Sequence, residues 1–256
     1  MAFLVPDAAL HWGLMNDPVG THGSRTIMLR ELRQLLGADV AGGDLDAYRD
    51  AVVGGNVLQK ATVTTRKESF RRLRELYGLT QEVLLFRALH DLWAADELGQ
   101  PLIALLCACA RDPILRETAP LIVRIPEGET VLPQQISEAA RQAFPDRYNP
   151  TMLANIGRHA ASSWQQSGHL RGRLRKTRAR AESRPTALAY ALLLGHLCDV
   201  RGDALFSTLW CRLLDAPIHL MREQAQTASR QGWIEYRSGG GVTEVGFRHL
   251  LRDIDV

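Results

Sequence analysis

Prolines mark the starts of the apolar segments that make up much of this 256-residue chain. Pro101, Pro113, Pro150, Pro185 and Pro217 each open a run that reads as a helix. Proline suits the first turn of a helix, where its missing N–H costs no hydrogen bond, and it disrupts a helix further along. The pattern therefore predicts a mainly α-helical chain of short, packed helices.

The first part of the chain reads as a helical bundle. Residues 24–36 predict a helix with Ser24 as its N-cap, and Asp44–Val53 predicts a second. Thr64 or Thr65 can cap a third helix. From there to about residue 123 the chain is strongly apolar with helical spacing. We expect an N-terminal helical domain over residues 1–125.

The rest of the chain reads as one unit used twice, over residues 126–184 and 185–256. In the first copy a short helix over Ile136–Phe144 precedes a longer helix that Asn149 caps, and Gly168 ends it before a candidate strand. The two copies share little sequence identity, but they share the order of their elements, which is typical of internal repeats.

The second copy has the same order and a clearer ending. Asp203 is expected to cap its middle helix, and a third helix runs from Pro217 to a stop at Gly232. An alternating stretch with the turn Ser-Gly-Gly-Gly then predicts a β-hairpin. Helix, turn, longer helix and hairpin is the order of a winged helix-turn-helix. The expected fold is mainly α: an N-terminal helical bundle followed by two winged helix-turn-helix units with short β-hairpins.

Charge is concentrated in two segments. Residues 170–184 hold seven cations and one acid, a local charge of +6, and residues 60–74 carry +5. The whole chain is only +3, so the remainder carries −8. Such basic patches are typical of nucleic-acid binding, although a solvated linker is the alternative for a bare charge run.

The winged-helix order assigns candidate double-stranded DNA contacts in both copies, since Arg and Gln make bidentate contacts to bases and basic wings lie along phosphates. In the first copy the face opposite the apolar stripe presents Thr151, Asn155, Arg158, Ser162 and Gln165. Its wing presents Arg171, Arg173, Arg175, Lys176, Arg178 and Arg180. The second copy presents His219, Arg222, Glu223, Gln226 and Arg230. Its hairpin carries two acids and one Arg, so packing or protein contact stays open for that copy.

Three motifs near the N-terminus carry a resemblance. They are Ser24-Arg25, the segment Asn56–Lys60, and Thr65 followed by Arg66, Arg71, Arg72 and Arg74. Residues 23–77 thereby resemble the BrxA family of bacteriophage-exclusion (BREX) defence systems. The resemblance implies a small, mostly helical DNA-binding protein without catalytic activity, encoded beside methyltransferase and ATPase partners.

Contacts to DNA or to a partner protein follow from that resemblance. It implies them for Asn56, Gln59, Lys60, Arg66, Lys67 and Arg71, and Arg74 lies on the same basic helix face. A structural explanation is also open for two of these residues, because Asn56 and Gln59 could satisfy backbone groups at a helix junction.

The sequence lacks the motifs of common enzymes. It has no GxxxxGK phosphate loop, no HExxH zinc motif and no recognisable nucleophile elbow. Its four cysteines form no CxxC pair and read as buried thiols of a reducing compartment. No apolar run approaches the roughly 20 residues of a membrane span, and no secretory signal is evident. We therefore expect no cofactor and no metal.

Taken together, these patterns predict a cytoplasmic, non-catalytic DNA-binding accessory protein of a BREX-type system that binds duplex DNA mainly through phosphates. The alternatives are a protein scaffold within a defence complex, which would use its winged helices to bind proteins, and a sequence-specific transcriptional regulator.

Overall fold

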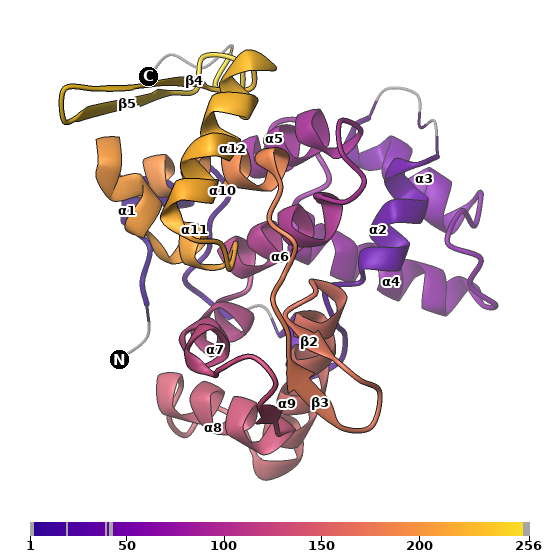
Figure 1. Ribbon diagram of the computed structural model, residues 1–256. Coiled ribbons are helices and arrows are strands. Elements are labelled where there is room, and N and C mark those ends of the chain that lie inside the picture. Colours follow the sequence, from indigo (N-terminus) through magenta and orange to yellow (C-terminus); the bar gives the residue numbers. More distant parts are fainter. Residues whose placement is uncertain (1–2, 19, 39, 41–42, 253–256) are drawn as a thin grey trace.

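The structure is a computed structural model that describes residues 3–18, 20–38, 40 and 43–252. It is mainly helical, with two small antiparallel sheets (Figure 1). The N-terminal part contains α1 (Asp7–Leu10), the 3₁₀ helix η1 (Thr21–Gly23), α2 (Leu29–Leu36), α3 (Leu45–Val53), α4 (Val63–Tyr77), α5 (Leu84–Trp93) and α6 (Gln100–Arg111). Figure 1 shows α2, α3 and α4 together on one side of the molecule.

The middle part combines three helices with a three-stranded sheet. Its elements are α7 (Pro113–Arg124), β1 (Thr130–Val131), α8 (Pro133–Ala143), α9 (Pro150–Gln166), β2 (Leu170–Arg171) and β3 (Lys176–Arg178). The strand order is β1-β3-β2, and all pairs are antiparallel. The strand expected after Gly168 is confirmed as β2, whereas β1 was not predicted.

The C-terminal part ends in a two-stranded hairpin. Its elements are α10 (Pro185–Leu197), the 3₁₀ helix η2 (Gly202–Ser207), α11 (Leu209–Arg212), α12 (Ile218–Arg230), β4 (Glu235–Gly239) and β5 (Val242–Gly246). The hairpin predicted from the alternating sequence is confirmed, with Arg237 opposite Glu244. In Figure 1 it extends along one end of the molecule beside α12.

Local capping signals predicted several helix starts correctly. The Asn149 side chain accepts a hydrogen bond from the Met152 N–H, and Pro150 is the first residue of α9. Asp44 likewise accepts from the Ala47 N–H at the start of α3. These caps satisfy N–H groups that have no partner inside the helix.

Three expected caps are wrong. Ser24 is not the cap of α2, which begins at Leu29 after Met28 adopts a left-handed conformation (φ 52°). Thr62, rather than Thr64 or Thr65, caps α4. Asp203 lies inside η2, and Thr208 caps the short α11 instead. For α4 and α11 a competing threonine lies within five positions of the expected cap, and the tertiary fold selects it; α2 begins after Met28 without a side-chain cap.

Among the described residues a main hydrophobic core runs through the chain, and a smaller cluster of Ile114, Ala140 and Ile156 joins α7, α8 and α9. α10 lies at the centre of the main core and packs against α5, α6, α11 and α12, and nearly every residue from Thr186 to Leu197 is buried. The core extends from Val5 to Leu250, so it crosses the expected boundaries at residues 125 and 184. The division of the sequence into three parts stays a prediction. Within the described ranges no helix has both the length and the apolar character needed to cross a membrane.

Helices α8 and α9 pack with their backbones in close approach. A Cβ placed on Gly157 of α9 would lie 2.3 Å from the Pro133 carbonyl oxygen and 2.4 Å from Ser137 Oγ. Glycine is therefore required at this crossing for steric reasons, because no larger residue leaves room for α8. The crossing fixes α9, which carries part of the candidate site, against its neighbour.

Candidate nucleic-acid interface

The β2–β3 hairpin (residues 170–178) is held at its base by two side-chain contacts. Arg175 Nε donates a hydrogen bond to Thr130 Oγ1 at 2.9 Å, which joins the turn to β1. Lys176 Nζ donates to Gln165 Oε1, which joins β3 to the last turn of α9. Gly172 has φ +99°, and a Cβ there would lie 2.1 Å from the Arg175 carbonyl oxygen. The turn is thus a defined structure that requires glycine.

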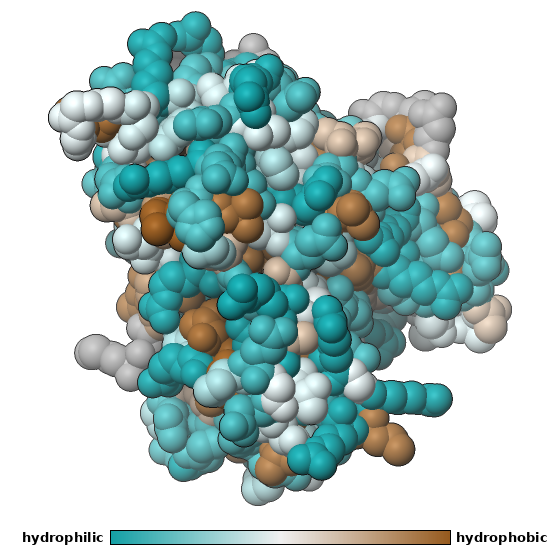
Figure 2. Space-filling model, in the orientation of Figure 1, coloured by the Kyte–Doolittle hydropathy of each residue, from teal (hydrophilic) through white to brown (hydrophobic). Residues whose placement is uncertain are grey.

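Cations along and just after this hairpin lack acidic partners. Arg171, Arg173, Arg175 and Arg180 are exposed, and Lys176 is half-buried. In the part of the chain that the structure describes, no carboxylate forms an ion pair with any of these five side chains. Partial burial lowers the pKa of Lys176. Hydrophilic side chains project from the surface of Figure 2 where Figure 1 places the hairpin. The five cations form a surface that can meet an anion.

Arg178 does not belong to that surface. Its side chain is almost fully buried, its guanidinium lies 2.8 Å from the Asp215 carboxylate, and it donates to the carbonyls of Ile122, His169 and Ala179. We therefore remove Arg178 from the candidate DNA contacts. Arg184, at the end of the basic run, likewise pairs with Asp96 at 2.9 Å.

The candidate face of α9 is most accessible at its N-terminal turns. Thr151 and Arg158 are exposed, whereas Asn155 is half-buried and accepts a hydrogen bond from Arg158. Ser162 and Gln165 are also half-buried, and Gln165 is engaged by Lys176. α9 and the hairpin are thus joined through Gln165, while Thr151, Arg158 and the hairpin turn stay exposed.

The corresponding face of α12 is less suited to an anion. His219, Arg222 and Gln226 are exposed, but Arg222 pairs with Asp203 at 2.9 Å. The other two residues expected on this face, Glu223 and Arg230, are also exposed. In the hairpin that follows, the single arginine stands opposite an acid. Acidic groups thus offset the cations of this unit.

Most cations of the 60–74 segment are used within the protein. Arg71 and Arg72 both pair with Glu68 and Glu75, and these arginines lower the pKa of Glu68 to about 2. Lys60 pairs with Glu31 at 2.8 Å. Within the described ranges, Lys67 and Arg74 are exposed and have no carboxylate partner. The segment therefore presents far less free charge than its sequence indicates.

Two residues of the resembling segment, Asn56 and Arg66, bond local backbone with their side chains. Asn56 Oδ1 accepts a hydrogen bond from the Lys60 N–H, and Asn56 adopts a left-handed conformation (φ 52°). Gln59 also adopts a left-handed conformation (φ 53°), and its side chain is exposed. Arg66 donates to the Val53 and Lys60 carbonyls. These contacts agree with the structural explanation that the sequence left open for Asn56, and they leave Gln59 accessible.

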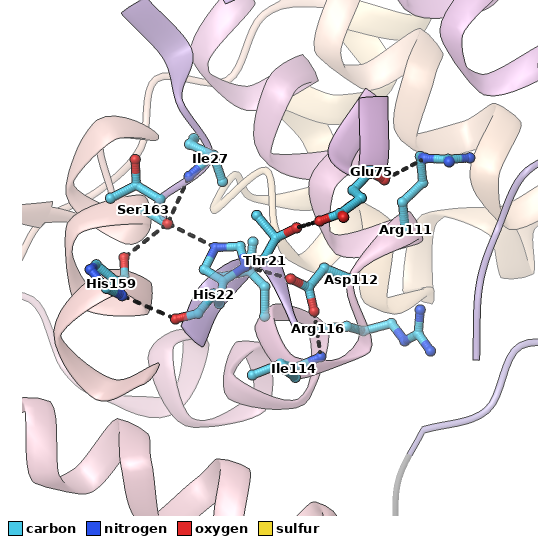
Figure 3. Close-up of polar contacts among 12 residues, drawn as sticks. Thr21, His22, Ile27, Glu75, Arg111, Asp112, Ile114, Arg116, His159 and Ser163 are labelled. Atoms are coloured by element: carbon cyan, nitrogen blue, oxygen red, sulfur yellow. Dashed lines mark hydrogen bonds and ion pairs between the residues drawn. The ribbon is translucent and has the colours of Figure 1, made fainter. Parts of the chain in front are cut away.

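A buried polar cluster that the sequence did not reveal lies behind α9 (Figure 3). His22 Nδ1 lies 2.7 Å from Asp112 Oδ2, and His22 Nε2 lies 2.9 Å from Ser163 Oγ. The three residues come from η1, the start of α7 and α9, so no local sequence signal joins them. Their order, Ser to His to Asp, is also that of a hydrolase triad.

The surroundings of this cluster favour a structural role. All three side chains are fully buried. Ser163 Oγ also accepts from the Ile27 N–H at 3.0 Å and lies 3.0 Å from the His159 carbonyl oxygen, so each direction around it is occupied. A nucleophile must reach its substrate, and this hydroxyl has no path to one. The cluster connects the N-terminal segment to α9.

No model of a known protein family matches the sequence, and no curated protein matches it.

Among the described residues, His, Cys, Asp and Glu side chains nowhere gather in a group of three that could hold a metal ion. The cysteine thiols are buried except for Cys198, which is half-buried, and burial raises the pKa of Cys107 to about 11 and that of Cys211 to about 12.

Proposed function

We propose that residues 113–178 form a winged helix-turn-helix unit that binds double-stranded DNA without catalysing a reaction. The order α7, β1, α8, α9, β2 and β3, with β1 paired to β3, supports this assignment. It begins the unit at α7, earlier than the boundary at residue 126 expected from sequence. In this proposal α9 enters the major groove by its first turns, and the β2–β3 hairpin is the wing.

The observation that carries the proposal is the set of unpaired cations on the wing. Arg171, Arg173 and Arg175 are exposed without carboxylate partners in the described part of the chain, whereas Arg178 at the base of the same hairpin, Arg71 on α4 and Arg222 on α12 are paired. Neutralising phosphates releases condensed counterions, so cations in this state supply affinity for DNA. An arginine already paired with a carboxylate contributes much less.

A salt titration of duplex binding tests the proposal. Affinity should fall steeply between about 50 mM and about 200 mM salt, with a slope that rises by about 0.9 per phosphate contact. The triple variant R171E/R173E/R175E should bind weakly and lose about three contacts from that slope. The variant R230E/R237E/R248E changes net charge equally on the C-terminal unit and should bind as the wild type. Absence of duplex binding at low salt would contradict the proposal.

The C-terminal unit is proposed to contact protein rather than DNA. The specific observation is that Asp203 pairs with Arg222 and also accepts a hydrogen bond from Thr243 of the hairpin, so the face of α12 and the hairpin are tied together by an acid. A pull-down of partner proteins that survives the wing reversals would support this second role. The transcriptional-regulator alternative predicts instead that Arg158→Ala and Arg222→Ala both relax sequence preference.

On the resemblance of residues 23–77 to the BrxA family alone, we further propose an accessory role in a BREX-type defence system. The partners would be a methyltransferase and an ATPase. Co-purification of the tagged protein with either enzyme tests this part. Gln59, Lys67 and Arg74 are exposed residues of the segment, and their substitution should weaken that association.

A further inference from the structure

The tip of the β2–β3 hairpin exposes a leucine between two arginines. Leu174 is 100% exposed, the highest value for any large hydrophobic residue in the described ranges; the next is Leu4 at 67%. Leu174 lines a surface hollow of about 390 Å³ together with Leu132 and Pro133, and its own side chain stays fully open to solvent. In Figure 2 a hydrophobic side chain projects beside hydrophilic ones where Figure 1 places this turn.

The turn holds this leucine in place. Gly172 supplies the left-handed conformation that closes the turn, and Arg175 and Lys176 anchor its far side to Thr130 and Gln165. Exposing an apolar side chain to water gives no stability to the folded protein. A fixed, exposed leucine flanked by unpaired arginines is therefore suited to a partner that is anionic and offers an apolar crevice.

We propose that Leu174 is a wedge that enters the DNA minor groove at a base step and bends the duplex, with Arg173 and Arg175 on the flanking phosphates and groove floor. This rests on the proposed function of the wing. The minor groove, about 6 Å wide, admits side chains at a hairpin tip but not a helix. Apolar wedges inserted beside arginines partly unstack a step and kink DNA toward the major groove.

A lipid surface is the competing partner for a basic tip with an apolar residue. Membrane binding scales with the buried apolar area, and here the exposed apolar side chains are only Leu174 and the neighbouring Leu132, too small an area for a stable anchor. The hairpin is joined to the polar end of α9 through Lys176 and Gln165, and the cations around it suit a groove lined by phosphates better than an acyl layer. A wedge, by contrast, needs only one side chain, because its effect depends on entering a single step.

The test uses the full chain and a duplex of about 30 base pairs with a central TpA step, the kind of step that kinks most easily. Anisotropy measures affinity, energy transfer between end labels measures bending, and a 2-aminopurine at the step reports unstacking. The wild type should shorten the end-to-end distance and raise 2-aminopurine fluorescence. Leu174→Ala should lose both signals while its affinity falls by no more than about tenfold.

Val242→Ala is the matched control, because Val242 is also an exposed apolar residue at a hairpin turn, in the C-terminal unit. It should bend the duplex as the wild type does. Binding without bending, or bending that survives Leu174→Ala, would overturn the wedge and leave the proposed function standing. No binding at all would overturn the proposed function. Leu174-dependent binding to phosphatidylserine vesicles, with duplex left straight, would overturn the wedge in favour of a membrane.

Discussion

Asp215 joins the basic hairpin to the segment between α11 and α12, because its carboxylate lies 2.8 Å from the guanidinium of Arg178. The same carboxylate accepts a hydrogen bond from the Ala181 N–H at 3.2 Å. A second contact runs in parallel, since His169 Nε2 donates to the Leu213 carbonyl at 2.9 Å. The base of the hairpin is thus fixed on both sides, by Arg178 at the end of β3 and by His169 just before β2, while its tip projects.

The Arg178–Asp215 pair predicts a large stability difference between two arginines of one basic run. Arg178→Met leaves the Asp215 carboxylate and three carbonyls without their partner, so it should lower the free energy of unfolding by about 3 kcal/mol or more. Arg173→Met, at an exposed position, should change it by less than about 0.5 kcal/mol. Urea denaturation of both variants measures this, and equal losses would contradict the assignment.

Histidine burial predicts a loss of stability in mild acid. Burial lowers the pKa of His169 to about 4 from 6.5, and it lowers that of His196 to about 4 as well. The unfolded chain binds these protons at higher pH than the folded chain does. Stability is therefore full above about pH 6.5 and is lost as the pH falls toward 4. His169 alone accounts for up to about 3 kcal/mol of this loss.

Urea denaturation at pH 7 and pH 5 checks the acid effect. The variant His169→Gln should be less stable than the wild type at pH 7 but should lose less stability on going to pH 5. His219→Gln, which changes an exposed histidine, should keep the wild-type pH dependence. If His169→Gln loses as much unfolding free energy between pH 7 and pH 5 as the wild type does, other groups cause the acid sensitivity.

The crossing of α8 and α9 predicts a strong effect of one methyl group. Gly157→Ala should lower the free energy of unfolding by about 1–3 kcal/mol or more, because the new Cβ collides with the Pro133 carbonyl and Ser137 Oγ. The neighbouring exposed substitution Ala154→Ser should have little effect. Thermal unfolding of both variants measures the difference, and a stabilised Gly157→Ala would show that the helices can separate at no cost.

The elements that the sequence predicted correctly are those whose signal lies within a few neighbouring residues. Asn149 followed by Pro150 marks the start of α9, and the alternating residues around the Ser-Gly-Gly-Gly turn mark the C-terminal hairpin. Both signals act within a few residues, so neighbouring side chains decide the outcome. β1 has only two residues and becomes a strand only through pairing with β3, which lies 45 residues later and is invisible to a local pattern.

The candidate site shows the same division. Seven cations in the 170–184 run look equivalent in the sequence, yet Arg178 is buried and Arg184 is paired, because Asp215 and Asp96 approach from distant segments. On α4 the acids that pair with Arg71 lie three and four residues away, so helical spacing could have revealed that pairing. The cluster of His22, Asp112 and Ser163 joins three segments and offered no such signal.

Gly172 provides the sharpest separation between the folded protein and its proposed DNA-binding surface. Its φ of +99° disfavours any side chain, and a Cβ would meet the Arg175 carbonyl oxygen at 2.1 Å. Gly172→Ala should therefore reshape the turn and scatter Arg173 and Arg175, while the core, which contains neither residue, stays intact. We expect duplex affinity to fall about tenfold or more, as loss of ordered phosphate contacts implies, with little change in far-ultraviolet circular dichroism.

Gly240→Ala is the control, because Gly240 also has a positive φ (+57°) in a hairpin turn but faces open space. An alanine there also has a positive φ, but it meets no neighbouring atom and belongs to no proposed DNA contact, so the affinity of this variant should match the wild type. Equal affinity in both variants would show that DNA binding does not depend on the shape of the β2–β3 turn.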